Sequence, residues 1–563
     1  MASITKKMKK GRPYYYAVES ARVNGKPRIV WQKYLGTVDA IVQRAERARP
    51  AKPKETVIFE AGGVAALLRI AQRLGVLELI DDVVPKREQG PSVGHYMVLA
   101  AINRAMAPTS KLKIGDWYED TVLRRLWRFK KAAFLSQRFW DHMDMISERA
   151  IDIIQDELAL RVQREFGVDG QTLLYDTTNF FTFLSTTNDR CGLAQRGHSK
   201  AKRYDLRQVG LALLVTSDHQ IPLFHRVYPG NTPDVSLFTE LVREMIERHK
   251  RILKTGAETT LVFDKGNVSD DAMERIVVEK QHFVAAMAAN RVPHILAAPL
   301  NQFEDVPGLP GTKALQNREI FFGKECFFVT VYTESFFTQQ MYGITHNMVK
   351  CQKKLLDLEK ILIKWRAGKA RGKAPTAPGV KKSANSILAP QFMKDIFKVK
   401  VEAEKGLPVL SYEVNHNALE RLSNERLGRT VLVTDRMDWN AKQTIETYRS
   451  LSQIEEAFKN MKNIEFLHWQ PAYHWTDQKL RVHGFYCVLA LLLSTLAKKI
   501  AAAAGIELSL PSLLKELAAI REVAVIYPKD APTQPKDHIT LTRMSPQQRK
   551  LANSLEIGLI LGR

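Results

Sequence analysis

The first third of the chain begins with alternating residues and continues with helical spacing. Two aromatic-rich runs over residues 13–36 flank an Asn-Gly pair at 24–25, which is typical of a β-hairpin closed by a type I′ turn. From about 61 to 165, apolar residues recur every three or four positions, and this spacing predicts helices. We therefore predict a hairpin, followed by a linker or frayed helix, over residues 1–56, and a helical domain over residues 57–166.

After residue 170 the pattern changes to strands. Three apolar runs with hairpin-like spacing lie between residues 171 and 231, and helices then alternate with short strands as far as residue 287. Such an order predicts a mixed α/β sheet with an antiparallel half, which is the order of an RNase H-like fold. We predict that residues 167–289 form the first part of this core.

Residues 290–429 interrupt the alternation, and we predict that they form an insertion domain. They contain strand-like pieces, a long helical run around 345–365 and a segment, 366–382, that has six Lys or Arg residues and no acid among Gly, Ala and Pro. This composition predicts flexibility. The segment is either a solvated linker or an arm that follows a DNA backbone.

The α/β pattern resumes with an apolar strand at 429–435 and a helix from Asn440. We assign residues 430–500 to the second part of the core and residues 501–563 to a C-terminal helical region. The fold class is therefore a multidomain α/β protein. Its RNase H-like mixed-sheet catalytic core is interrupted by an insertion domain and preceded by a β-hairpin and a helical domain.

Charge narrows the class of partner. The chain has 84 Lys and Arg against 60 Asp and Glu, a formal net charge of +24 over 563 residues. Because such an excess repels itself in a compact fold, a polyanion, and nucleic acid first, is the natural partner, although ribosomal and membrane-surface proteins are also basic. The run Arg124–Lys131 alternates cations with aromatics. It is either a surface helix or a phosphate-contacting surface of a DNA-binding domain.

Cysteine usage and hydropathy favour a cytoplasmic protein. Cys191, Cys326, Cys351 and Cys487 have no CxxC spacing, which argues against a zinc site or a disulfide framework. The basic start of the chain is not followed by an apolar signal segment. The longest apolar run, residues 485–497, is too short to span a bilayer and is interpreted as a buried core helix. We expect no membrane association.

Two aspartates stand in unusual places. Asp176 lies inside an apolar strand, where a carboxylate must be hydrogen-bonded, desolvated or bound to a metal. Asp264 ends another apolar strand, where an α/β sheet presents functional groups to its edge crevice. Each taken singly is more often a structural, turn-capping residue.

A third acid, Glu455, is placed by helical geometry. At 100° per residue, Tyr448, Glu455 and Lys462 share one arc of the helix from Asn440, beside an apolar arc that contains Phe458. The alternative is an ordinary amphipathic helix with a Glu and a Lys on its wet face.

These residues resemble the motifs of bacterial insertion-sequence transposases of the DDE class, in the group whose third motif reads Tyr-x2-Arg-x3-Glu-x6-Lys (YREK). Tyr448, Glu455 and Lys462 match that motif with its spacing, and Leu451 stands where the family has Arg. The runs YDTTNFF and LVFDKGN, which carry Asp176 and Asp264, resemble the first and second motifs.

The resemblance covers most of the chain and implies a metal-dependent nuclease and strand transferase. Asp176, Asp264 and Glu455 would be both the catalytic residues and the ligands of two Mg²⁺ ions, for which Mn²⁺ can substitute. Tyr448 and Lys462 would contact phosphate near the cut, and Lys459 could supply the cation missing at Leu451; Arg449 is the other candidate for that role.

A basic loop that contains Lys200 and Arg203 either guides DNA or is merely solvated. The implied partners are double-stranded DNA, as terminal inverted repeats and target, and a second copy of the chain in a synaptic homodimer. The implied location is the bacterial cytoplasm, on the nucleoid. The alternatives are an RNase H-like nuclease without strand transfer and a catalytically silent DNA-binding descendant of a transposase.

Overall fold

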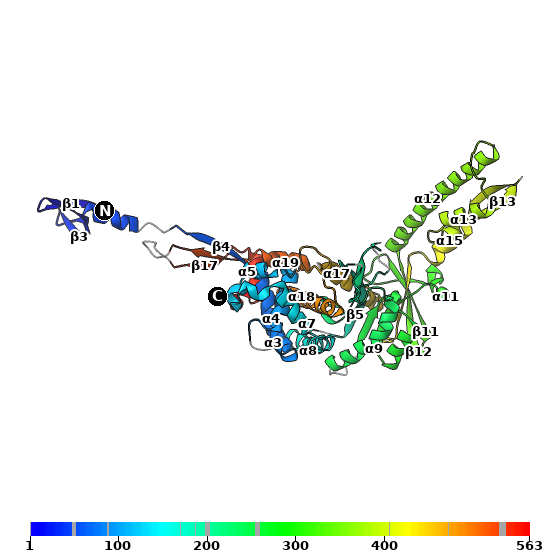
Figure 1. Cartoon of the computed structure of the whole chain (residues 1–563), viewed down its shortest axis with the longest axis horizontal. Helices are drawn as coiled ribbons and strands as arrows, with labels where there is room; N and C mark the ends of the chain where they lie inside the picture. The colour runs from blue at the N-terminus through cyan, green and yellow to red at the C-terminus, as the bar shows by residue number, and fades with distance from the viewer. Residues whose placement is uncertain are drawn as a thin grey trace. The chain divides into compact units, whose positions relative to one another are not determined.

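The computed structural model describes residues 2–47, 52–86, 89–168, 170–185, 187–197, 203–253, 259–404, 406–470, 472–528 and 536–562 (Figure 1). The chain forms two compact units. The first consists of Met1–Arg69, Leu112–Leu135 and Ile500–Arg563, and the second of Ile70–Lys111 and Ser136–Lys499. The predicted helical segment 57–166 is thus divided between the two units.

A large mixed sheet organises the second unit. In the described residues its strands are β5 (Thr172–Thr182), β6 (Arg207–Thr216), β7 (Pro222–Pro229), β8 (Thr260–Phe263), β9 (His282–Met287), β10 (Glu304–Asp305), β11 (Thr312–Phe321), β12 (Lys324–Thr333) and β15 (Arg429–Thr434). Their order is β10-β11-β12-β15-β9-β8-β5-β6-β7. Strands β5, β8 and β9 pair in parallel and the other pairs are antiparallel. The predicted mixed sheet is confirmed.

The central strands form because their side chains are buried on both faces. Leu173, Leu174 and Tyr175 of β5 are at most 2% exposed, as expected for a strand covered on both sides. One glycine is required by close packing: a Cβ on Gly210 of β6 would lie 2.1 Å from the ring of Tyr228 on β7. The ring therefore rests directly on the backbone of β6.

Helices of the second unit pack around this sheet. They are α3 (Val76–Val83), α4 (Val93–Met106), α7 (Ser136–Asp144), α8 (Glu148–Phe166), α9 (Asp234–Leu253), α10 (Asp270–Val278), α11 (Pro293–Leu296), α16 (Ala441–Arg449), α17 (Leu451–Met461) and α18 (Asp477–Ala503), with the 3-10 turns η2 (Lys265–Asn267) and η3 (Leu300–Gln302). Side-chain caps start several of them: Ser147 accepts from the backbone of Ala150, and Ser269 from that of Ala272.

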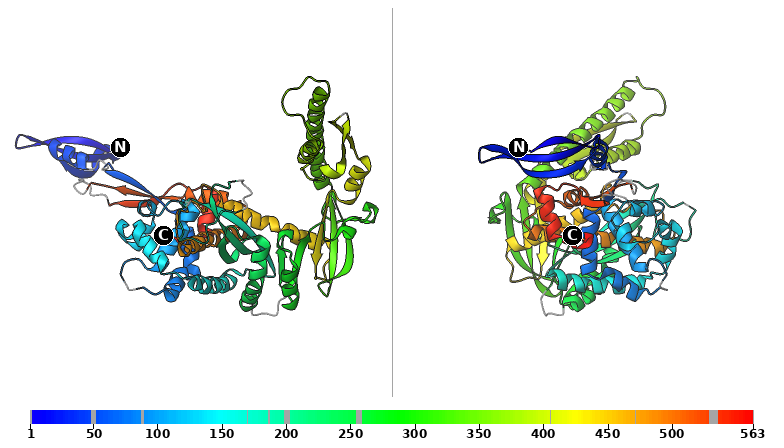
Figure 2. Two further views of the ribbon diagram at one scale, coloured as in Figure 1. Left: turned by 45° about the vertical axis from the view of Figure 1, so that its right-hand side comes forward. Right: turned by 90° about the vertical axis from the view of Figure 1, so that its left-hand side faces the viewer.

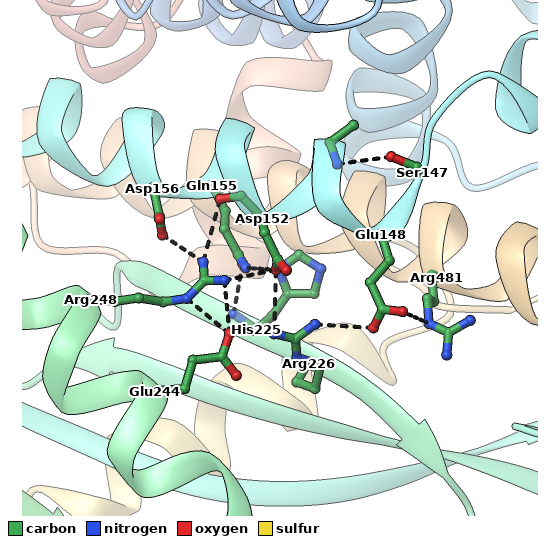
Figure 3. Close-up of polar contacts among 11 residues, drawn as sticks. Ser147, Glu148, Asp152, Gln155, Asp156, His225, Arg226, Glu244, Arg248 and Arg481 are labelled. Carbon is green, nitrogen blue, oxygen red and sulfur yellow. Dashed lines mark hydrogen bonds and ion pairs between the residues drawn. The ribbon is translucent and has the colours of Figure 1, made fainter.

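An ion-pair network joins α8 to β7 and α9 (Figure 3). Arg226 lies 2.5 Å from Glu244 and 3.4 Å from Asp152. Arg248 lies 2.8 Å from Glu244, 3.1 Å from Asp152 and 2.6 Å from Asp156. Each arginine contacts acids from both helices, so the network fixes α8 and α9 relative to the edge of the sheet. Loss of Arg248 would remove a counter-charge from three partly buried carboxylates, those of Asp152, Asp156 and Glu244.

Residues 334–427 build a hydrophobic core of their own. This module comprises α12 (Glu334–Arg366), α13 (Ala377–Ile387), α14 (Met393–Ile396), β13 (Phe397–Glu404), β14 (Leu407–Val414) and α15 (His416–Glu425). Its core includes Leu355, Leu362, Met393 and Ile396, and α12 lies beside β14 in both views of Figure 2.

Two expectations about this module need correction. The long helix extends well beyond residues 345–365, because its apolar spacing begins at Phe336. The segment 366–382, predicted to be flexible throughout, is helical from Ala377 onward. Thr376 caps that helix and Pro378 occupies its first turn, where proline is tolerated.

The first unit contains two small sheets. Its elements are β1 (Ala2–Lys9), β2 (Arg12–Val23), β3 (Lys26–Gly36), α1 (Val38–Arg47), β4 (Glu55–Glu60), α2 (Gly62–Arg73, which continues into the second unit), α5 (Ile114–Glu119), α6 (Leu123–Trp127), η1 (Lys131–Phe134), α19 (Leu510–Ala518), β16 (Arg521–Ile526), β17 (His538–Leu541), α20 (Pro546–Ser554) and α21 (Ile557–Leu561). The sheets have the orders β1-β2-β3 and β17-β16-β4.

The predicted Asn-Gly turn is confirmed, since Asn24 and Gly25 have φ of 53° and 78°. Other expectations for the first unit were incomplete. β1 extends the hairpin to three strands, and residues 38–47 form a helix. The predicted all-helical region 501–563 is wrong for β16, whose β-branched residues Val523, Val525 and Ile526 pair with β4, and for β17.

The apolar run 485–497 belongs to α18, which is longer than that run. In the part of the chain that the structure describes, α18 alone is long and apolar enough to cross a membrane, and 78% of its apolar window is buried inside the protein. Within the second unit, Phe485, Leu489, Leu493 and Leu496 are buried. This burial agrees with the interpretation of α18 as a core helix.

The buried ring of His225 on β7 predicts a pH dependence of stability. Burial, with the charges of Arg226 and Arg248, lowers the pKa of His225 to about 3. The unfolded chain therefore binds a proton below pH 6.5 that the folded chain does not, so stability falls as the pH falls from 6.5 toward 3. Between pH 7 and pH 5 this residue should cost about 2 kcal/mol of unfolding free energy.

We expect His225→Phe to remove this contribution, so that the pH 7-to-5 loss in urea-induced unfolding becomes smaller by about that amount. The exposed His416 provides the control, because His416→Phe should leave the slope unchanged. Equal slopes for wild type and His225→Phe would contradict the assignment.

Candidate active site

Strand pairing brings the two predicted aspartates together. β5 and β8 are parallel, and their register ends with Tyr175 opposite Phe263. In each strand the next residue is an acid. Asp176 follows on β5, and Asp264 comes directly after β8, where the backbone is still extended. Neighbouring strands lie about 4.8 Å apart, and paired residues face the same side of the sheet. Asp176 and Asp264 therefore start from adjacent positions on one face.

Helix α17 carries the third acid against the same strand. α17 packs on β5 through Ile454, Ala457 and Phe458, which are at most 5% exposed, and Glu455 stays on the solvent-facing side. The predicted apolar arc is thus confirmed. The predicted single helix is interrupted at Ser450, which separates α16 from α17 while its own backbone remains near-helical.

Tyr448, at the end of α16, links the acids. Its ring packs against the cluster that includes Val329, Val331 and Ile445. Its hydroxyl donates a 2.9 Å hydrogen bond to Oδ1 of Asp264. The contact joins residues 184 positions apart in sequence and fixes α16 at the end of β8.

The charges of all three acids act on Tyr448. Burial, followed by the charges of Asp264, Glu455 and Asp176, raises the pKa of Tyr448 well above its ordinary value. Its hydroxyl therefore remains a proton donor in the physiological range. The structure thus gathers the three predicted acids around one phenol.

The three acids are of the chemical type that binds a divalent cation. Carboxylate oxygens are the ligands that Mg²⁺ prefers. Within the described residues, which include all three acids, no three His, Cys, Asp or Glu side chains already converge closely enough to bind an ion. The Tyr448 hydroxyl is the partner of Asp264 Oδ1.

A cavity of about 620 Å³ adjoins Lys462 at the end of α17. Lys462 Nζ donates to Thr178 Oγ1 at 2.8 Å and lies 5.3 Å from the ring centre of Phe180. Phe180 stacks on Trp469 with ring centres 4.4 Å apart. The cavity thus combines a cation with flat apolar walls.

A family model described as the transposase DDE domain matches residues 167–493, more than half of the chain. The chain belongs to this transposase family. Among solved structures, the cryo-EM structure of a piggyBac transposase synaptic complex with hairpin DNA is similar to this transposase at 10% identity, over 81% of this chain and 79% of that chain, with a TM-score of 0.36. A likeness of this strength assigns neither fold nor function. No curated protein matches the transposase.

The other cations predicted for this transposase have different surroundings. Lys459 is exposed in the last turn of α17. Arg449, the alternative for the position of Leu451, instead donates to Thr312 Oγ1 on β11 at 3.1 Å. Arg203 makes a bidentate pair with Asp205, at 2.8 Å for both bonds, which neutralises part of its charge. Lys200 lies outside the described residues.

Sequence reasoning missed the support of the cavity wall. Arg104 of α4 is 1% exposed and donates to the backbone oxygens of His468 and Gln470 at 3.1 and 2.7 Å. It thereby fixes the segment that holds Trp469 against the cavity. A lone arginine among the apolar residues of the α4 segment was the available signal. His474 and His483 are buried.

The Tyr448–Asp264 bond makes a testable contribution to the fold of this transposase. Tyr448→Phe retains the ring and removes the donor, and we expect it to lower the free energy of unfolding, measured in a chelator, by about 1.5 kcal/mol, as for a hydrogen bond to a charged group. Tyr473 is 63% exposed, so Tyr473→Phe should have little effect. Equal stabilities of the two variants would refute the contribution of the bond.

Proposed function

We propose that this transposase is a Mg²⁺-dependent enzyme that cleaves DNA at the ends of its element and joins the freed 3′-OH to target DNA. Asp176, Asp264 and Glu455 are its catalytic residues. The observations that carry the proposal are the hydrogen bond from the Tyr448 hydroxyl to Asp264 and the charges of Asp264, Glu455 and Asp176 that all act on this phenol, in a chain of the DDE transposase family.

The acids would hold two ions, with Asp176 shared between them and Asp264 and Glu455 each binding one. Mn²⁺ can replace Mg²⁺ because it also accepts oxygen ligands. When bound, such a pair of ions supplies an activated nucleophile and stabilises the leaving oxygen of an in-line displacement. Because Tyr448 donates to Oδ1 of Asp264, an ion bound there would share this carboxylate with the hydroxyl.

The chain's own residues would position DNA for two reactions. Water first attacks a phosphodiester at the element's end; the bond to the 3′ oxygen breaks and a 3′-OH is released. That hydroxyl then attacks a phosphodiester of the target, so that one phosphodiester replaces another and no ATP is needed. Lys462 would contact phosphate as a point charge, with Tyr448 beside it and Lys459 one turn away from Glu455. Lys200 and Arg203 would guide the strand.

Topology supports an RNase H-like core. The order β7-β6-β5-β8-β9 has antiparallel pairs first and parallel pairs after, in keeping with the mixed sheet with an antiparallel half that the sequence predicts. Residues 290–429 would then be an insertion domain of this core. The motif around Tyr448 supports the YREK type of bacterial insertion-sequence transposase, despite Leu451.

Two ends must be paired for transposition, so we propose a homodimer that binds terminal inverted repeats and target DNA in the cytoplasm, on the nucleoid. Residues 57–166 are proposed to contribute to DNA binding.

Neutralising single acids tests the active site. We expect Asp176→Asn, Asp264→Asn and Glu455→Gln each to reduce Mg²⁺-dependent cleavage of an end-containing duplex by at least about 10³-fold, because each removes a metal ligand. Binding of the same duplex, measured in EDTA, should stay within about threefold of wild type, since the altered groups are not cations.

Glu456 offers a matched control, since it neighbours Glu455 in α17 and bonds to Gln220 at 3.3 Å. Glu456→Gln should keep nearly full activity. Undiminished cleavage by any of the three site variants would remove that residue from the active site.

Salt tests whether the net charge of +24 serves DNA binding. Neutralised phosphates release counterions, so the logarithm of the affinity should fall linearly with that of the salt concentration. With six or more phosphate contacts, the affinity should drop about 10³-fold or more between 50 and 200 mM KCl. A flat dependence, read by fluorescence anisotropy, would mean that the charge has another role.

A further inference from the structure

The three-stranded sheet β1-β2-β3 at the start of the chain has no role in the site described above, and the family match, residues 167–493, leaves it out. We propose that this sheet is a DNA-binding module that lays one defined face against duplex DNA. This polar face consists of Lys7, Lys9, Arg12, Tyr14, Tyr16, Gln32 and Tyr34. The choice of DNA as the ligand of this face rests on the proposed function.

The charge of the sheet is extreme for its size. Residues 2–36 contain nine Lys or Arg and one acid, Glu19, a difference of +8 (9 − 1) within a chain of +24. A cluster of cations with interleaved aromatics is the footprint expected for nucleic acid. The positive charge is concentrated at the two turns of the sheet. Five cations lie from Lys6 to Arg12 at the first turn, and Arg22, Lys26 and Arg28 flank the Asn-Gly turn.

The strand register sorts these side chains into two faces. Lys7 pairs with Tyr14, and Lys9 with Arg12, between β1 and β2. Tyr16 pairs with Tyr34 between β2 and β3. Paired residues point to the same side of a sheet, so these side chains share the polar face.

The opposite face has a different composition. Glu19 pairs with Ala2 and Trp31, and so lies on that face. Ile4 and Met8 are there too, 67% and 60% exposed. The polar face carries no acid, which makes it the face complementary to a phosphate backbone.

Contacts across the polar face hold its groups in place. Lys7 Nζ donates to Gln32 Oε1 at 2.9 Å and lies 4.9 Å from the ring centre of Tyr16. The rings of Tyr16 and Tyr34 are 5.1 Å apart. These are cations, amides and phenols that can reach phosphates and base edges, and the cross-strand contacts reduce the entropy that they lose on binding.

The sheet has almost no hydrophobic core. Among residues 2–36, all of which the structure describes, Val18 is the one buried apolar side chain, and its pairing with Gln32 places it on the polar face, which is covered at that point. Lys7, Lys9 and Arg12 are all exposed. A sheet with so little core gains stability when a partner covers a face.

The dimensions also fit a duplex. β2 has 12 residues, which at about 3.4 Å per residue gives a length of roughly 40 Å, close to the 34–36 Å of one helical turn. The basic turns at the two ends of β2 are therefore spaced to meet phosphates about one helical turn apart along the duplex.

Matched charge changes on the two faces test the proposal. The full chain is compared as Lys7→Gln/Lys9→Gln on the polar face and Lys6→Gln/Lys33→Gln on the opposite face, each losing two exposed cations. The probe is a fluorescein-labelled duplex of mixed sequence, about 30 base pairs or three helical turns. Its affinity is measured by anisotropy in EDTA at several KCl concentrations.

We expect the polar-face variant to bind about tenfold more weakly, and its salt slope to fall by about 1.8, as for two lost phosphate contacts. The opposite-face variant should lose less than about threefold, because its charges act only through a screened distance. Thermal melting of both variants, with wild type alongside, verifies that the fold is retained.

Other results would overturn the proposal. Equal losses for the two variants would reduce the effect to bulk charge, and no loss for either would exclude the sheet from DNA binding. Tighter binding of single-stranded DNA or of duplex RNA, lost in the same variant, would assign the face to another nucleic acid. Since EDTA prevents metal-dependent cleavage, these outcomes are independent of the active site. If the proposed function is wrong, the wild-type protein will bind the duplex but will not cleave it when Mg²⁺ is added.

Discussion

The parallel pairing of β5 with β8 is the constraint on which the candidate active site depends. Only this register puts Asp176 and Asp264 at neighbouring positions on one face of the sheet. A slip by one residue would turn one carboxylate to the other face and place an apolar side chain beside its partner. The burial of Leu173, Leu174 and Val262 on these strands stabilises the register. The apolar core thus sets the position of the acids.

Tyr448 transmits that constraint to the third acid. Its ring belongs to the cluster around Ile445 while its hydroxyl reaches Asp264, so α16 has one position at the end of β8. α17 begins directly after Ser450 and must run along β5. Glu455 is therefore positioned by the packing of α17, close enough to the phenol for its charge to raise the pKa of Tyr448. A cation bound at Asp264, as proposed, would share that carboxylate with the same phenol.

Much of the fold and of the candidate site could be predicted from the sequence pattern. The features that could not be predicted depend on contacts between distant segments. Asp176, Asp264 and Glu455 were identifiable because each breaks or adjoins an apolar pattern, and the apolar arc of α17 followed from helical periodicity. The partners were not predictable: the bonds of Tyr448 to Asp264 and of Arg449 to Thr312 depend on tertiary packing between distant segments. β16 was missed because its pairing strand, β4, is more than 450 residues away in sequence. Short apolar runs alone do not separate strand from helix.

A long stretch of chain separates Asp264 from Glu455, but it does not disturb the position of the acids. The chain leaves the sheet after β9 and re-enters it beside β9. After β9 it forms β10 to β12 and the module of residues 334–427, and it returns as β15, which pairs directly with β9. The returning strand also pairs with β12, so the interruption is clamped at both ends by sheet hydrogen bonds. Loop-closure entropy grows only slowly with length, and here the closure is made by a strand rather than a free loop. Because α16 starts from β15, its position is independent of what the module contains. The module can therefore vary in size and chemistry without moving the carboxylates.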